Sequence, residues 1–474
     1  MKESNYNFYI NDHEANIYLI YNALKNTLIR DNEGKVQKFV KQFKDNIHYS
    51  PKYLTKEEYN DLVSSGIIVS NDTKEKQVAI DRNKKRFEIL HQKKESLSLV
   101  ITPTLCCNFK CYYCFESLNT RKNEEFINIE VQNDIINFIK KSIEENHVQK
   151  IYITWYGGEP LIQRDIIFSM QEKINELCKI NDVKLMSTMV SNGFLLSPEV
   201  CGKLYELGIK QIQITIDGPE QIHNKRRYYP VNPSNNYNQI VENILQANDK
   251  IMFNFRVNID KTNKDYIFEL IDDLIKRKVW PYKRNVHIYT AQVRANNNAD
   301  FVLSTKEYAI IEENIRCYLI DKYNEIMQTN KAKRNFLYPK FGGNVECGYG
   351  VFPNSWVISY NGDVFRCWES VGQAELKVGT MKDLLEDFGQ SIFNKVKLDT
   401  QTFERWGCFD CKFFPICGSK CPWDFVKHKR CIEWKEVIEY RLLSQYKLFL
   451  KEPAVYLNTP FNVEINDYNQ TNKQ

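Results

Sequence analysis

Short apolar runs alternate with helix-like segments between residues 97 and 291. Such runs are typical of strands buried on both faces, whereas apolar residues spaced three or four apart are typical of amphipathic helices such as Val131–Ile143 and Tyr266–Ile275. The predicted strands are Leu97–Thr102, Ile151–Trp155, Leu185–Val190, Ile212–Ile216, Phe253–Ile259 and Val286–Thr290. Six βα repeats indicate an α/β fold with a parallel sheet, which binds its ligands at the carboxyl ends of the strands.

Residues 1–95 follow a different pattern. Apolar and polar residues alternate from Asn7 to Ile29 as in a hairpin, and Val36–Phe43 and Glu57–Val63 have the periodicity of amphipathic helices. The charged run Asp81–Glu95 is expected to form a helix or linker with a solvated surface, and a basic contact patch is the alternative. A small α+β domain is therefore expected at the N-terminus.

The regular pattern ends near Asn298, and seven cysteines follow between Cys347 and Cys431. An amphipathic helix is predicted at Trp434–Phe449, and the polar end of the chain is expected to be mobile. The sequence thus predicts an N-terminal domain, an α/β unit, a bridging segment, a cysteine-rich domain and a tail, at 1–95, 96–297, 298–346, 347–450 and 451–474.

The composition excludes several classes of protein. A chain of 474 residues with 43% hydrophobic and 26% charged residues is globular, and its formal charge of +5 is too small to indicate a nucleic-acid partner. The sequence shows neither a secretory signal nor an apolar run long enough for a membrane span, so the cytoplasm is the expected location, without a membrane partner. Since thiols stay reduced there, clustered cysteines are expected to bind metal or to act in catalysis.

Three of the fourteen cysteines, Cys107, Cys111 and Cys114, directly follow the first predicted strand. Three thiolates within eight residues can bind three corners of an iron–sulfur cube and leave its fourth iron open. A zinc knuckle is the alternative, but a closed zinc site takes four protein ligands, and only the adjacent Cys106 is near at hand.

This spacing resembles the signature of the radical S-adenosylmethionine (SAM) superfamily, CxxxCxxC after the first strand of a partial, TIM-like (β/α)6 barrel. The resemblance implies that Tyr113 lies near the adenine of SAM. The sequence Gly157-Gly158-Glu159-Pro160 follows the second predicted strand and matches the family motif that takes the amino group of SAM. A turn alone would explain the glycines but not the Glu-Pro that follows them.

The resemblance continues after the later strands. Ser191 and Asn192, before Gly193, match the place where the family contacts the ribose or carboxylate of SAM. Asp217 begins a DGP stretch that is similar to the one in the subfamily that modifies proteins and peptides.

Three more polar side chains belong to this stretch or to the fifth strand. His223 and Arg227 are expected to hold the DGP loop rather than to do chemistry. Arg256, which alternates inward with Asn258, is a candidate for contact with a carboxylate of SAM.

The second cysteine group resembles the SPASM domain, a C-terminal extension of radical SAM enzymes that holds two auxiliary [4Fe-4S] clusters. A zinc ribbon is the alternative, but seven cysteines do not divide into two four-ligand sites. The family pattern assigns Cys347, Cys367 and Cys421 to the first auxiliary cluster, and Cys408, Cys411, Cys417 and Cys431 to the second.

The first auxiliary set lacks one ligand, because Pro353 stands where some family members have an eighth cysteine. The resemblance therefore implies an open iron that another protein group or a substrate thiolate would fill. Cys106, Cys178, Cys201 and Cys317 are expected to be packing residues.

The resemblance implies an oxidoreductase that cleaves SAM reductively to a 5'-deoxyadenosyl radical, with flavodoxin or ferredoxin as electron donor. A maturase that forms a thioether crosslink in a ribosomally synthesised peptide (RiPP) is the first hypothesis, with carbon–carbon crosslinking or epimerisation left open. The N-terminal domain resembles the element that recognises a leader in a precursor peptide, by addition of a strand.

Two alternatives differ in testable ways. Anaerobic sulfatase-maturing enzymes, which form formylglycine, have an Asp as the proposed base directly after the second SPASM cysteine, where this chain has Trp368 and then Glu369. A non-catalytic electron carrier or zinc scaffold would not need the Gly157–Pro160 motif. No catalytic side chain is assigned from the sequence.

Overall fold

The computed structural model describes residues 1–44, 46–114, 116, 125–232, 235–294, 300–329, 334–335, 351–417, 431–451, 456–457 and 461–463. The chain forms two compact units. The central unit comprises Leu90–Gln328 and Gly348–Lys397, and the terminal unit comprises Met1–Ile89, Thr329–Cys347 and Leu398–Gln474. The cysteine-rich segment expected at 347–450 is thus shared between the two units.

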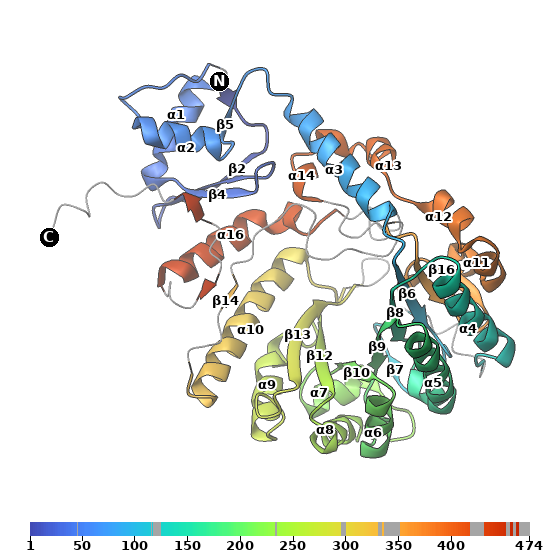
Figure 1. The fold of residues 1–474 in the computed structure, drawn as a ribbon. Helices are drawn as coiled ribbons and strands as arrows, with labels where there is room; N and C mark the ends of the chain where they lie inside the picture. Colours follow the sequence, from blue (N-terminus) through green and yellow to red (C-terminus); the bar gives the residue numbers. More distant parts are fainter. Residues whose placement is uncertain are drawn as a thin grey trace. The chain divides into compact units, whose positions relative to one another are not determined.

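The central unit is built on a parallel sheet, as predicted. Its six predicted strands are present, and each pairs in parallel with its neighbour in the order β13-β12-β10-β9-β8-β6 (Figure 1). Their bounds are Ser96–Ile101 for β6, Lys150–Trp155 for β8, Lys184–Ser191 for β9, Ile209–Thr215 for β10, Met252–Ile259 for β12 and Val286–Gln292 for β13.

Three short strands extend this sheet beyond β6. Strand β15 (Ser355–Ile358) pairs with β6 in parallel, and β16 (Asp363–Phe365) and β17 (Gly379–Thr380) follow it as antiparallel strands. The region after the barrel therefore continues its sheet, which the sequence did not predict.

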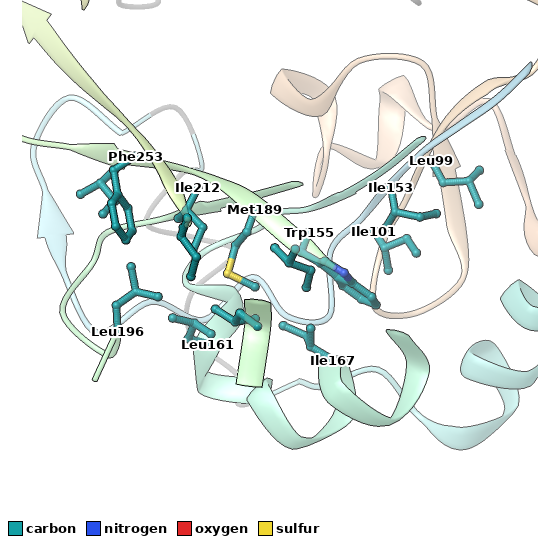
Figure 2. Close-up of a cluster of buried hydrophobic side chains, with 14 of the residues drawn as sticks. Leu99, Ile101, Ile153, Trp155, Leu161, Ile167, Met189, Leu196, Ile212 and Phe253 are labelled. Carbon is teal, nitrogen blue, oxygen red and sulfur yellow. The ribbon is translucent and has the colours of Figure 1, made fainter. Parts of the chain in front are cut away.

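Helices follow the strands, and most of them contribute apolar residues to the core beside the sheet. They are α4 (Ile129–Glu144), α5 (Arg164–Ile180), α6 (Pro198–Glu206), α7 (Glu220–Arg226), α8 (Asn236–Gln246), α9 (Ile267–Lys276), α10 (Thr305–Ile326), α11 (Met381–Asp387) and α12 (Gln390–Val396). Figure 2 shows the core between them, where Trp155, Met189 and Ile212 of three neighbouring strands gather with Leu161 and Ile167. This core fixes the strand ends that carry the predicted site.

Helix α10 lies beyond Asn298, where the regular strand–helix pattern of the sequence ends. It begins at a capping box, in which Ser304 accepts a hydrogen bond from the Glu307 amide and the Glu307 carboxylate accepts one from the Ser304 amide. Few of its residues are buried, so its sequence lacks a single apolar stripe.

The terminal unit contains the small α+β domain predicted at the N-terminus. Strands β2 (Asn7–Asp12), β3 (Ile17–Asn22) and β4 (Thr27–Arg30) form an antiparallel sheet, and β1 (Lys2–Glu3) pairs with β5 (Ile68–Val69). Ile20 and Ile29 of the sheet pack with Val36 and Phe39 of the first helix. The helices of this unit are α1 (Lys35–Phe43), α2 (Lys56–Ser64), α3 (Glu75–His91), α13 (Thr400–Arg405), α14 (Phe414–Cys417) and α16 (Trp434–Lys451).

Part of the predicted tail takes regular backbone structure within the terminal unit. Strand β18 (Tyr456–Leu457) pairs with β14 (Arg334–Asn335), and β19 (Phe461–Val463) pairs in parallel with β4. The polar end of the chain, residues 466–474, for which mobility is predicted, lies outside the described residues. Among the helices that the structure describes, none combines the length and the apolar composition that crossing a membrane requires.

Candidate functional site

The loop that carries Cys107, Cys111 and Cys114 follows β6 and is tied to the loop after β10. Its two-residue strand β7 (Lys110–Cys111) pairs antiparallel with β11 (Arg227–Tyr228), which places Arg227 opposite Cys111. Inside the loop, the Cys114 amide donates to the Cys111 carbonyl over 3.2 Å. We call residues 107–114 the cluster loop, and its backbone is held by a segment more than a hundred residues away.

Tyr113 lies at the centre of a buried polar group. Its hydroxyl donates to the Asp217 carboxylate and accepts a bond from Arg227 at 2.7 Å. Burial, Asp217 and Cys111 together raise the pKa of Tyr113, although the charge of Arg227 opposes this shift. Asp217 is fully buried and also accepts a bond from the Asn258 amide at 3.0 Å. The structure thus brings predicted residues from three loops together.

A second buried group, which sequence reasoning missed, fixes Tyr112. Arg226 donates to the Tyr112 hydroxyl at 2.6 Å and to Asp260 at 2.7 Å, and Tyr112 donates to the other Asp260 oxygen at 2.5 Å. The side chains of Arg226 and Asp260 are 3% and 0% exposed. The Arg226 guanidinium also lies over the rings of Tyr112 and Tyr113, at 5.3 and 5.2 Å from their centroids. We call Tyr112, Arg226 and Asp260 the tyrosine clamp.

Gly157 and Gly158 allow the loop after β8 to approach the loop after β6 closely. A Cβ on Gly157 would lie 2.2 Å from the Thr104 carbonyl oxygen, and one on Gly158 would lie 2.1 Å from the Cys106 carbonyl oxygen. Gly157 also has a φ of 125°, in the region that favours glycine. Both glycines therefore have a structural reason in this chain, besides the SAM contact that the resemblance predicts for them.

Glu159 is fully buried, and its carboxylate is engaged by the protein itself. It accepts bonds from the Ser191 hydroxyl at 2.9 Å, the Asn192 amide at 2.7 Å and the Leu161 amide at 3.1 Å. Burial raises the pKa of Glu159 to about 7, against the lowering effect of these donors. Glu159 therefore joins the second and third predicted SAM loops, while Pro160 begins the short helical turn Pro160–Gln163 behind it.

Asn192 connects these loops to the cluster loop. Its side-chain amide donates to the Asn108 side chain at 2.6 Å and lies 4.0 Å from the Cys107 sulfur. Each predicted thiolate thus has a neighbour on another loop. Cys111 lies opposite Arg227, and Cys114 is near enough to Tyr156 for its charge to raise the pKa of the tyrosine.

His223 holds the DGP turn, as expected. Its Nδ1 accepts the Asp217 amide at 3.3 Å, and the side chain is fully buried. Burial and the two neighbouring arginines lower its pKa, so the ring is neutral. Arg256 donates to the Asn258 side chain at 2.8 Å and stays partly exposed at the strand ends.

Trp368 stands beside the predicted SAM loops. Its indole stacks on Tyr156, the residue before Gly157, with ring centroids 5.3 Å apart and planes at 23°. Tyr156 is buried, and burial together with the charges of Glu116 and Cys114 raises its pKa. Neither ring accepts a proton near neutral pH, so this pair offers a surface rather than a base.

The described part of the second cysteine group lies in both units. Cys367 belongs to the central unit, whereas Cys408, Cys411, Cys417 and Cys431 belong to the terminal unit. Burial and the three other thiols of this set raise the pKa of Cys408 to about 11. Cys347 and Cys421 lie outside the described residues, so the predicted first auxiliary set stays a prediction.

Two of the four cysteines expected to pack do so. Cys178 and Cys201 are 3% and 0% exposed within the central core, and burial raises the pKa of each thiol to about 11. Cys106 and Cys317 are half-buried.

Comparisons with known proteins agree with this geometry. Residues 101–274 match the Radical SAM superfamily. These residues form a radical SAM domain. The matched segment begins on β6 and ends on α9, so it contains the cluster loop, both buried polar groups and the Gly157–Pro160 motif. This segment of the chain is therefore similar to radical SAM enzymes, and the family supports a [4Fe-4S] cluster and SAM as cofactors.

Relatives extend the similarity beyond this domain. The radical SAM cyclopropyl synthase TigE of Paramaledivibacter caminithermalis is 23% identical over 86% of this chain and 87% of its own length. A cysteine-type anaerobic sulfatase-maturating enzyme of Clostridium novyi is 23% identical over 69% of this chain and 88% of its own. The solved structure of native anSMEcpe with bound AdoMet shares the fold, with a TM-score of 0.55 and 16% identity over 75% of this chain and 99% of that chain.

The residues present fit the cofactors by their chemistry. The cluster loop supplies three thiols, which would hold three irons of a cube and leave its fourth iron for SAM. Among the side chains that the structure describes, no three His, Cys, Asp or Glu converge on the position of a single metal ion. Cys107, Cys111 and Cys114 therefore remain the predicted ligands of the SAM cluster.

Proposed function

We propose that this protein is a radical SAM maturase that modifies a ribosomally synthesised peptide. The observation that carries the proposal is the interlocked arrangement of the cluster loop with the loops after β8, β9, β10 and β12, at one edge of the sheet. When bound there, the cluster and SAM supply the electron and the 5'-deoxyadenosyl group that removes a hydrogen atom from substrate. The chain's own loops position these groups and exclude water from them.

A peptide substrate is supported from two directions. TigE and the sulfatase-maturating relatives match most of this chain, and the latter are named for acting on a protein. The four-stranded sheet of the terminal unit is of the kind to whose edge strands the leader of a precursor peptide can add a strand. A flavodoxin or ferredoxin is the proposed electron donor.

The proposed product is a thioether crosslink, because the incomplete auxiliary set leaves an iron to which a peptide thiolate can bind. Carbon–carbon bond formation is the second candidate, and the similarity to a cyclopropyl synthase favours it. Formylglycine formation is disfavoured by Trp368, whose ring stacks on Tyr156 in the place proposed for a base.

We also propose two auxiliary clusters, held by Cys347, Cys367 and Cys421 and by Cys408, Cys411, Cys417 and Cys431. Anaerobically reconstituted protein should then hold about twelve irons in three cubes. Cys408→Ala should lower the iron content by about four without abolishing SAM cleavage. The control Cys178→Ala, a change in the apolar core, should leave the iron content unchanged. An iron content of about four in the unaltered protein would reject the auxiliary clusters.

SAM cleavage tests the central claim. The reduced protein should release 5'-deoxyadenosine from SAM, and replacing Cys107, Cys111 and Cys114 together by Ala should abolish this release. If cleavage persists in the triple variant at the rate of the unaltered protein, the radical SAM assignment of the site fails.

The product test begins with short cysteine-containing reading frames beside the gene. The corresponding synthetic peptide, incubated with enzyme, SAM and reductant, should lose two hydrogens and one alkylatable thiol if a thioether forms. Loss of two hydrogens with every thiol still alkylatable would favour the carbon–carbon product. An unchanged mass would contradict both.

A further inference from the structure

The sheet of the terminal unit is buried on both faces, so only its edges can accept a further strand. Ile20 and Ile29 point into the core that contains α1, and Leu19 and Leu28, which alternate to the opposite face, are fully buried as well. The order of the sheet is β19-β4-β3-β2. The outer edge of β4 is thus occupied by β19, residues Phe461–Val463, from the C-terminal part of the same chain.

The two ladders on either side of β4 differ in regularity. Four consecutive pairs, from Asn22 with Thr27 to Leu19 with Arg30, join β4 to β3 without interruption. On the outer side, Phe461 pairs with Leu28 and Val463 with Ile29, and the register shifts between the two pairs. An irregular ladder of two pairs stabilises less than a continuous one, because the extra residue leaves backbone groups without a partner.

A strand held this way is a replaceable occupant. The outer edge of β4 presents a row of backbone N–H and C=O groups that any extended segment can satisfy, whatever its side chains. A segment that pairs with all four residues of β4 would make a longer ladder than β19 makes. The segment that contains β19 is also attached to the chain at β18, so it returns to the edge at a high effective concentration once the edge is free.

We propose that residues 461–463 occupy the peptide-binding edge of this enzyme and must leave it when an extended segment of the substrate peptide pairs with β4. The substrate part of this inference rests on the proposed function, whereas the exchange of β19 does not. The partner is an extended peptide recognised through its backbone. In the resting protein the chain's own strand therefore competes with substrate.

The exchange is tested with two truncations and a peptide from the chain itself. One variant lacks residues 458–474, and its matched control lacks residues 464–474 and keeps β19. The probe is a fluorescent peptide with the sequence of residues 458–466, and a control peptide carries Phe461→Pro and Val463→Pro, which remove the N–H groups of both paired residues. Binding is measured by anisotropy, and amide exchange of Thr27–Arg30 by mass spectrometry.

We expect the probe to bind the protein lacking 458–474 at least about tenfold more tightly than it binds the protein lacking 464–474, since a tenfold difference means an edge open about a tenth of the time. Exchange at Thr27–Arg30 should rise in the former variant and fall again when the probe is added. Full-length protein with Phe461→Pro and Val463→Pro should behave like the shorter truncation product, which guards against a folding defect of that variant. Equal probe affinity and equal exchange in all variants would overturn the inference.

The substrate arm uses the precursor peptide identified in the product test. It should displace the probe and bind the protein lacking 458–474 at least about tenfold more tightly than the control. If the precursor is modified but never displaces the probe, substrate does not use this edge and the inference is wrong, while the proposed function stands. If SAM is cleaved and no peptide is modified, the proposed function fails, and the probe experiment still decides the exchange of β19.

Discussion

The two described cysteine loops are held in different ways. The cluster loop is fixed by segments far away in the sequence, through the ladder with Arg227–Tyr228, the tyrosine clamp and the Asn108–Asn192 bond. The backbone bonds of the segment Cys408–Cys417 form local turns, with the Cys411 amide donating to the Cys408 carbonyl and the Cys417 amide to the Phe413 carbonyl. Its links to distant residues run through side chains, since Asp410 bonds to Lys76 and Phe413 packs on Phe8. The backbone of the first loop is thus paired with a distant strand, whereas the backbone of the second bonds locally and only its side chains reach distant residues.

The tyrosine clamp gives the largest expected effect. Arg226→Ala leaves Asp260 as an uncompensated buried charge and should lower the free energy of unfolding of the central unit by about 3–5 kcal/mol. Lys203→Ala, which removes an exposed ion pair with Glu172 on the same unit, should cost about 0–1 kcal/mol. Urea unfolding of both variants measures the difference, and equal losses would mean that the clamp does not hold the cluster loop.

The close approach at Gly158 gives the next effect. Gly158→Ala places a Cβ against the Cys106 carbonyl, so the loop must shift, and a displacement of about 1 Å in a reacting site can cost about 100-fold in rate. The matched control is Gly202→Ala on α6, where nothing lies within 4 Å of the added atom. Release of 5'-deoxyadenosine is the measurement, and a Gly158→Ala enzyme with the unaltered rate would contradict the tight fit of the two loops.

Removal of iron separates the two loops directly. Chelation should increase amide exchange of Cys408–Cys417 by about tenfold more than that of residues 107–114, because the backbone bonds of the former are local turns whereas the latter pairs with β11, and a loss of about 1.4 kcal/mol is tenfold. Hydrogen exchange of the apo and reconstituted proteins tests this expectation. A larger increase in the cluster loop would reverse the comparison.

The smallest expected effect concerns the start of helix α1 in the terminal unit. Asp31 accepts bonds from the amides of Val36 and Gln37 at 2.7 and 2.9 Å and so caps α1. Asp31→Ala should therefore destabilise this unit by about 1 kcal/mol, and Asp72→Ala, an exposed position, should change little. Thermal unfolding of the two variants measures the difference. An Asp31→Ala protein as stable as the Asp72→Ala control would show that the bonds from Asp31 do not stabilise α1.

The six parallel strands were predictable because each contains a short apolar run, such as Phe253–Ile259, although buried and more exposed residues alternate along β6 and β8. The polar residues after them were predictable because parallel strands end at one edge. The tyrosine clamp was not, since Tyr112, Arg226 and Asp260 are far apart in the sequence and nothing in their spacing couples them. The sequence did offer one signal for this group, namely two opposite charges close to predicted site residues. Arg226 directly precedes Arg227, and Asp260 follows Asn258 by two residues.

Other differences have equally local causes. Strands β15 to β17 are too short for a two-residue period to be recognised, although they extend the main sheet. The motif predicted a contact between Glu159 and SAM, and the structure shows in addition that the Glu159 carboxylate accepts hydrogen bonds from the Ser191 hydroxyl and the Asn192 amide. Side-chain partners of this kind come from tertiary packing, which one sequence does not specify.

The pairing of Cys111 with Arg227 has a consequence for the order in which the protein is made. During synthesis the three cysteines leave the ribosome more than a hundred residues before the strand that fixes their loop, which at the usual speed of translation is roughly ten seconds. During that time the chain lacks β11, so the loop that carries the thiols cannot yet take its final conformation. Insertion of a cluster at these thiols is therefore expected to follow the emergence of β11, which makes it a late event in the life of the nascent chain.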